Sequence, residues 1–145
     1  MELTNTALQT VDAGSVVVYD AVAVRPSCCM AYREGSGQIT LKGQNNGRRR
    51  YLVSFEANVG LLATGDTPAA NTDFDSASLA IAIDGEPVES ARMIVTPAAL
   101  GTLNNVSCSC YVDTPCGCCV TISVENTTGE PIEVQNASLL ATRTA

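Results

Sequence analysis

Cysteine is the residue type in this chain with the greatest capacity for chemistry. Five of the seven cysteines lie within CSCYVDTPCGCCV (108–120), two more are adjacent near the N-terminal end, and the chain has no histidine. Thiolates bind metals, form disulfides and act as nucleophiles. The pattern therefore poses a choice between a metal site, cross-links and reduced side chains that pack as small apolar groups. The candidate residues are Cys28, Cys29, Cys108, Cys110, Cys116, Cys118 and Cys119.

The cysteine spacing does not suit a metal site within one chain. Zinc sites use C-x₂₋₄-C pairs on turns, whereas the spacings here are C-x-C and C-x-C-C. On a strand, Cys108 and Cys110 would share a face about 7 Å apart, and Cys118 and Cys119 would point to opposite faces. A threefold axis could still bring together one cysteine from each of three chains. We predict no metal and no cofactor.

Disulfides fit the pattern better than a metal does. Cys110 and Cys118 flank the segment YVDTPCG, where a bridge between two adjacent strands is feasible. Cys28 and Cys29 are expected to face in opposite directions, one inward and one outward. An odd number of cysteines leaves one thiol over, which indicates pairing between chains or a free thiol. The alternative is that all seven are reduced, as in a cytosolic protein.

The remaining polar residues give little support to catalysis. Without histidine, neither a Ser-His-Asp nor a Cys-His arrangement is possible. Asp66, Asp73 and Asp75 lie in a polar loop, where carboxylates are ordinarily solvated. The alternative is a calcium ion held by Asp73, Asp75 and loop carbonyls, but the spacing lacks the residue order of an EF-hand. Asp84 and Glu86 flank a turn, where carboxylates are ordinarily solvated. We predict a protein that is not an enzyme.

Charge and hydropathy restrict the partners and the location. A net charge of −7 and a pI near 4.3 disfavour nucleic acid and anionic membranes, which both require a basic surface. The one basic run, Arg48–Arg50, is expected to be a solvated loop or strand end. No apolar run approaches the ~20 residues of a membrane span, and the first residues lack the pattern of a secretory signal. We therefore expect synthesis in the cytoplasm, with a final location on a virion or on a cell or spore surface.

Apolar residues recur with a period of two along almost the whole chain, which predicts strands. Asp84-Gly85 is a hairpin turn signal, and 61–77 is expected to be one long polar loop. Eight to ten short strands at hairpin spacing predict an all-β antiparallel sandwich of jelly-roll type, formed by residues 1–145 as a single domain. The predicted strands are 15–24, 37–43, 51–60, 78–88, 90–98, 102–112, 118–126 and 131–144.

Three segments resemble those of a known family in their order along the chain. GRRRYLVSFEANVG (47–60) is similar to its G-x-Y-x-V-S-F strand, and LAIAIDGEPVESARMI (79–94) to its long hairpin. VTISVENTTGEPIEVQNASLLATRTA (120–145) is similar to its last two strands. The family is the C1q/TNF-like jelly roll, in the bacterial and phage form found at the ends of collagen-like fibre proteins. The chain also resembles an uncharacterised group from gut Firmicutes and their prophages. A Gly-X-Y stalk is absent from this sequence.

The resemblance implies a compact homotrimer in which one sheet of each subunit packs around the threefold axis. We therefore expect a structural or adhesive protein that decorates a phage particle or bacterial surface, with other virion or surface-layer subunits as possible partners. One alternative is a disulfide-linked subunit of an extracellular filament or spore-type appendage. Another is a carbohydrate- or receptor-binding module that uses the 61–77 loop.

The alternation also separates an expected core from an expected interface. A strand that is apolar on both faces must cover its outer face, and association of subunits would do so. The expected interface residues are Leu52, Ala80, Ala82, Leu139 and Leu140. The expected core residues are Tyr51, Phe55, Leu79, Ile81, Ile83, Val120, Ile122, Val124, Ile132 and Val134.

Overall fold

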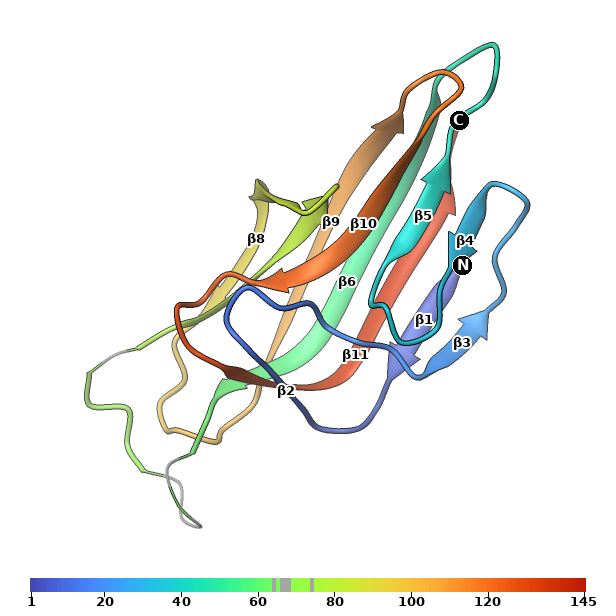
Figure 1. The fold of residues 1–145 in the computed structure, drawn as a ribbon. Helices are drawn as coiled ribbons and strands as arrows, with labels where there is room; N and C mark the ends of the chain where they lie inside the picture. The colour runs from blue at the N-terminus through green and yellow to red at the C-terminus, as the bar shows by residue number, and fades with distance from the viewer. Residues whose placement is uncertain (64, 66–68, 74) are drawn as a thin grey trace.

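The fold is an all-β sandwich, seen in a computed structural model that describes residues 1–63, 65, 69–73 and 75–145 (Figure 1). Every helix or strand element in these residues is a strand. The strands are β1 (Glu2–Asn5), β2 (Gln9–Val11), β3 (Ala21–Val24), β4 (Met30–Tyr32), β5 (Ile39–Lys42), β6 (Arg49–Leu61), β7 (Ala77–Ile83), β8 (Glu86–Val95), β9 (Asn104–Thr114), β10 (Cys119–Asn126) and β11 (Ile132–Arg143).

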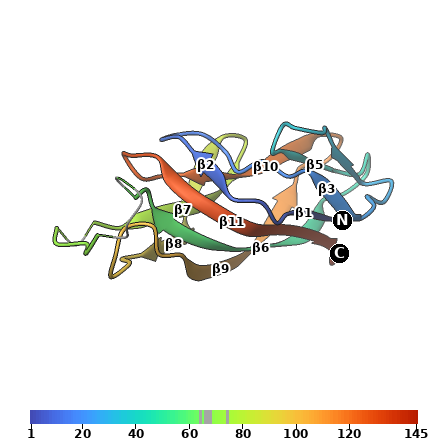
Figure 2. The ribbon, with the colours of Figure 1, turned by 90° about the horizontal axis from the view of Figure 1, so that it is seen from below.

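The strands form two antiparallel sheets that pack face to face (Figure 2). Sheet A has the order β3-β1-β11-β6-β9, with β2 pairing to β11, and sheet B has the order β4-β5-β10-β7-β8. The longest strands, β6, β9 and β11, lie side by side in sheet A. The chain passes repeatedly from one sheet to the other, which is the connectivity of a jelly roll. The predicted fold class is therefore confirmed.

The segment 15–24, predicted as one strand, divides between the two sheets. Val17 donates its N–H to the carbonyl of Val124 in β10, which places this part along sheet B. Asp20 donates to the carbonyl of Thr4, and β3 then pairs with β1 in sheet A. An uninterrupted apolar run does not show where a chain leaves one sheet for another. For that reason the prediction of a single strand was wrong.

The side chains between the sheets form one core, and they match the predicted set closely. Nine of the ten predicted core residues are buried, and Ile83, the tenth, is partly buried and packs against the core. Short strands were harder to predict, because β1, β2 and β4 have three or four residues each and too few positions to show alternation. The central core residues were predictable because they lie on the longest strands.

Candidate functional site

The outer face of sheet A carries a small exposed apolar patch. Leu52 on β6 lies directly opposite Tyr111 on β9, and Leu140 on β11 is diagonal to Leu52 on the same face. The side chain of Tyr111 is 66% exposed and that of Leu140 37%, while Leu52 is half-buried. We call Leu52, Tyr111 and Leu140 the sheet A patch. The sequence analysis identified the two leucines but missed Tyr111, although its alternation with Cys110 and Val112 indicates an outward side chain.

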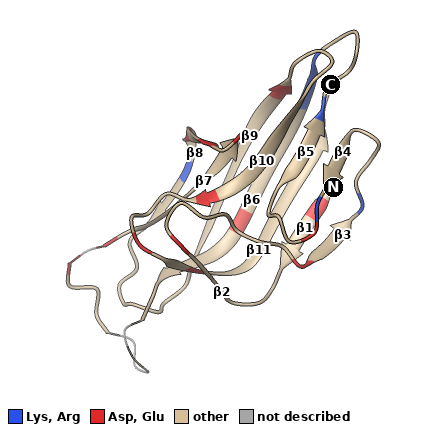
Figure 3. Cartoon of the chain, in the orientation of Figure 1, with Lys and Arg blue, Asp and Glu red and all other residues tan. Residues whose placement is uncertain are grey.

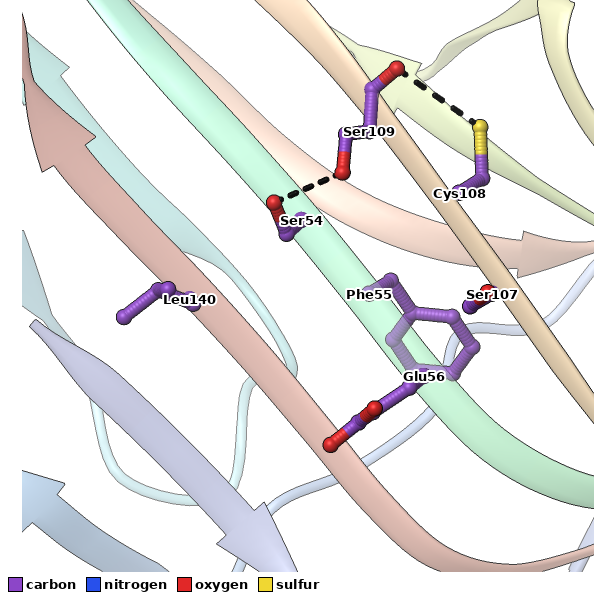
Figure 4. A pocket seen from close by; sticks show the side chains of 7 residues that line it. All are labelled: Ser54, Phe55, Glu56, Ser107, Cys108, Ser109 and Leu140. Atoms are coloured by element: carbon purple, nitrogen blue, oxygen red, sulfur yellow. Dashed lines mark hydrogen bonds between the residues drawn. The ribbon is translucent and has the colours of Figure 1, made fainter.

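Beside the patch, the same face bears polar side chains, most of which are short serines. Ser54 on β6 and Ser109 on β9 share a hydrogen bond of 2.8 Å across the two strands (Figure 4). The shallow hollow around them is bordered by Leu140, Glu56 and Ser107 (Figure 4). Short side chains let another surface approach closely, so this face is suited to contact with a sheet.

Three of the predicted interface residues do not lie on a free surface. Leu139 points into the core of the sandwich and is fully buried. Ala80 and Ala82 point out of sheet B but are also fully buried, because longer neighbours on β8 and β10 flank their methyl groups. The prediction was wrong for these three residues. Alternation alone does not distinguish a face covered by its own chain from one left open.

Cys108 and Cys110 point into the sandwich from β9 and pack against the core. They share a face, as the spacing predicted, and burial raises the pKa of Cys110. The disulfide predicted between Cys110 and Cys118 assumed that they lie on adjacent strands, and that assumption was wrong. Cys110 lies on β9 in sheet A, whereas Cys118 directly precedes β10 in sheet B, so the two strands are not adjacent. Both thiols are free.

The other five cysteines gather at one end of the sandwich. Lys42 N–H donates to the carbonyl of Cys29 at 2.8 Å, and Lys42 is in turn the β-partner of Cys119. Gly43 N–H donates to the carbonyl of Cys118 at 2.7 Å. A side chain at Gly43 would collide with the backbone of the 115–118 turn, so glycine is required there. We call this region the thiol end. Its cysteines are Cys28, Cys116, Cys118 and Cys119, which are exposed, and Cys29, which is buried.

The thiol end is also the cationic end of an acidic protein. Several blue segments gather near the C-terminus in Figure 3, beside one red segment on β9, whereas the other red segments are spread over the rest of the chain. Arg48 and Arg50 are exposed, as predicted, and Arg50 forms an ion pair with Asp113 at 2.7 Å. This ion pair lowers the pKa of Asp113. The five cations at this end, of eight in the chain, are Lys42, Arg48, Arg49, Arg50 and Arg143.

The alternative of a calcium ion at Asp73 and Asp75 receives no support from the described residues. Asp66 lies outside them, and among them no three cysteine or acidic side chains form a group that could hold a metal. Asn71 organises the described part of this loop instead, donating to the carbonyls of Asp75 and Pro97 and accepting from Asp75 N–H. A shallow hollow beside the loop is lined largely by Leu61, Leu62 and Leu100.

In the part of the chain that the structure describes, no helix has the length and hydropathy needed to cross a membrane.

Comparison with known proteins identifies the fold. No family model and no curated sequence matches the chain. Among solved structures, the globular domain of zebrafish complement 1qA matches with a TM-score of 0.56 and 10% identity, over 96% of this chain and 93% of that chain. The chain has a jelly-roll fold similar to that of this C1q globular domain. The resemblance drawn from 47–60, 79–94 and 120–145 is thereby confirmed at the level of the fold, and the bacterial or phage type stays a prediction.

Two carbohydrate-binding modules are more distant jelly rolls. The CBM35 of Cellvibrio japonicus Abf62 matches with a TM-score of 0.39 and 11% identity, over 100% of this chain and 98% of that chain. A family 35 module from Clostridium thermocellum matches with a TM-score of 0.35 and 12% identity, over 92% and 98% of the two chains. Similarity at this level supports no conclusion about a ligand for this jelly roll.

Proposed function

We propose that this jelly roll is a non-enzymatic structural module that associates with itself, as a homotrimer, through the outer face of sheet A. The observation that carries the proposal is the sheet A patch, beside short polar side chains of the same face. A contact of this kind gains stability from removing the patch from water. The family resemblance implies that one sheet surrounds a threefold axis, and the sheet A patch is the reason for choosing sheet A.

The proposed setting of the trimer is the surface of a phage particle or bacterial cell, where it would decorate other virion or surface-layer subunits. The chain carries a net charge of −7, which favours solubility of a crowded assembly and disfavours nucleic acid and anionic membranes. Synthesis in the cytoplasm, followed by display on a particle or a cell or spore surface, is part of this proposal.

Native mass spectrometry of the purified protein with reductant tests the trimer. We expect one mass, three times that of the 15.1 kDa chain, over a wide range of concentrations. Tyr111→Glu and Leu140→Glu place a carboxylate in the contact, so each should weaken association by at least about tenfold, or ~1.4 kcal/mol. The matched control is Ile94→Glu, because Ile94 is 63% exposed on the outer face of sheet B.

The outcomes of this experiment separate the alternatives. A monomer at micromolar concentrations would contradict the proposal. Equal effects of Ile94→Glu and Tyr111→Glu would also contradict it, because the interface would then not be specific to sheet A. An open series of masses in reductant would indicate a contact that does not close on itself.

A second candidate function is a disulfide-linked filament subunit, and the thiol end favours it. Four exposed thiols at one end of the molecule can be reached by another copy. Oxidation of one thiol from each of two chains by glutathione disulfide would join them and release two molecules of glutathione. Protein purified in air should then contain species larger than the trimer that collapse on reduction. A mass unchanged by reductant would exclude this function.

A further inference from the structure

Cys28 and Cys29 are the two central residues of a tight turn that leads into β4. Met30 N–H donates to the carbonyl of Ser27 at 3.1 Å and closes this turn. Within it, the two sulfur atoms are 3.4 Å apart. Cys28 is exposed and Cys29 is 3% exposed, so one thiol faces solvent and the other faces the core. A soluble oxidant can therefore reach only the first thiol directly.

The buried member of the pair is held firmly and lies near positive charge. Its carbonyl accepts hydrogen bonds from Lys42 N–H at 2.8 Å and from the Tyr51 hydroxyl at 3.2 Å. The hydrogen bond with Cys28 lowers the pKa of Cys29; Arg49 and Arg143 act in the same direction, and burial opposes them. A larger thiolate fraction favours attack on a nearby disulfide, although a lower pKa also makes the thiolate intrinsically less nucleophilic.

We propose that Cys28 and Cys29 form a redox site that reacts with small disulfides such as glutathione disulfide and closes to a disulfide between adjacent residues. The thiolate of Cys28 attacks glutathione disulfide, which gives a mixed disulfide and releases one glutathione thiolate. The thiolate of Cys29 then attacks the Cys28 sulfur and releases the second glutathione. The protein loses two protons and two electrons, and glutathione disulfide is reduced to two glutathione molecules.

The disulfide between Cys28 and Cys29 should be easily reduced again. Adjacent Cα atoms are about 3.8 Å apart, which is shorter than the ~4.4–6.8 Å found in ordinary disulfides. Such a bond is strained, and strained disulfides are more easily reduced. The site would therefore respond to the ratio of glutathione to its disulfide instead of forming a permanent cross-link.

Cys108, Cys110 and Cys119 of the same chain are too far from Cys29 to form a disulfide with it. Cys29 and Cys119 both flank Lys42 across sheet B, so their Cα atoms are separated by two strand spacings, or about 9.6 Å. A bridge requires less than about 7 Å. Cys108 and Cys110 lie in sheet A on β9, the edge strand opposite β3. Among Cys28, Cys108, Cys110 and Cys119, the adjacent Cys28 is therefore the partner with the shortest path to a disulfide with Cys29.

The native protein can be tested directly because one digest separates the two groups of cysteines. Trypsin does not cut after Arg25, which precedes proline, so Cys28 and Cys29 are the only cysteines of peptide 1–33, and all five others lie in peptide 93–143. The protein is equilibrated in glutathione buffers, quenched with acid, blocked with N-ethylmaleimide in denaturant near neutral pH so that buried thiols also react, and digested. We expect peptide 1–33 to become two hydrogen atoms lighter and lose both maleimide groups, and a reducing buffer to restore them.

Two variants test the order of the steps. In Cys29→Ser the reaction should stop at the first step, so peptide 1–33 should carry one glutathione. In Cys28→Ser peptide 1–33 should keep its single maleimide group in all buffers. The matched control Cys116→Ser removes an exposed cysteine of another turn and should leave peptide 1–33 unchanged in behaviour.

Two results with the wild-type protein would overturn the proposal, even if a variant fails to fold. In the first, peptide 1–33 keeps both maleimide groups in a buffer that oxidises peptide 93–143. In the second, peptide 1–33 is found linked to peptide 93–143 or to a second copy of itself. These results are independent of whether the protein forms a trimer.

Discussion

The two sheets bury their inner faces in the same way but differ on their outer faces. In sheet B, the outward residues Ala80 and Ala82 are short and are fully buried by longer neighbours of the same chain. In sheet A, the outward residues Leu52, Tyr111 and Leu140 are long and only partly covered by their neighbours, and Tyr111 is the most exposed of the three. The middle of the outer face of sheet B is therefore covered within the chain, with Ile94 exposed on the edge strand β8, whereas the exposed apolar residues of sheet A lie together on three neighbouring strands.

This difference shows that side-chain length matters as much as polarity on an outer face. An alanine in the middle of a sheet needs no subunit to shield it, because its flanking residues extend beyond its methyl group. A leucine or tyrosine extends beyond its neighbours and stays in contact with water. The argument that an apolar outer face requires association thus applies to the cluster on sheet A and not to Ala80 and Ala82 on sheet B.

The sharpest test of the comparison lengthens an outward side chain on sheet B. Ala82→Leu must displace its neighbours, so it should lower the free energy of unfolding by about 1–3 kcal/mol. Leu140→Ala on sheet A removes an exposed side chain, so it should change the free energy by less than about 0.5 kcal/mol. Urea denaturation of both variants in a Tyr111→Glu background measures the difference without a contribution from association. If the two variants behave alike, the two faces are not distinct.

A smaller effect on stability is expected at the β7–β8 turn, which contacts β10 of the same sheet through a side chain. Asp84 has a φ of 52° and accepts hydrogen bonds from Thr121 N–H at 2.7 Å and from the Thr121 hydroxyl at 3.2 Å. Asp84→Ala loses the acceptor and tolerates the left-handed backbone less well, so it should cost about 1–2 kcal/mol. Asp84→Asn keeps an acceptor and the backbone preference, so thermal unfolding should place it between the wild type and Asp84→Ala. An Asp84→Ala variant as stable as the wild type would contradict this role.

The sequence was sufficient for the long strands, most of the core and the jelly-roll class, because alternation persists over many residues there. It was insufficient where the outcome depends on distant segments. Whether Ala82 or Leu139 is exposed depends on neighbours from other strands, and the crossing within 15–24 depends on two different partners. The assignment of Cys110 and Cys118 to different sheets is a property of the topology. The exposure of Cys28 and the burial of Cys29 agree with the expectation from alternation, although the two residues lie in a turn with their sulfur atoms close together.

The smallest effect concerns the ion pair at the rim of the sheet A patch. Arg50 forms hydrogen bonds of 2.7 and 2.8 Å with Asp113, and its guanidinium lies 5.9 Å from the centre of the Tyr111 ring. Arg50 lowers the pKa of Asp113 in the folded protein, so the pair stabilises the fold above the pKa of a free aspartate, about 3.9. That contribution is lost as the pH falls through the lowered pKa of the folded state.

Asp113→Asn should therefore lower the urea midpoint slightly at pH 7, and the difference from the wild type should shrink on acidification. Both side chains are about half exposed, so salt should shrink the difference at pH 7 as well. If sheet A is covered by another copy, the pair is shielded from solvent in the assembly. The effect of Asp113→Asn should then be larger in the wild-type background than in Tyr111→Glu. Equal effects in the two backgrounds would place the ion pair outside the interface and confine the contact to the patch itself.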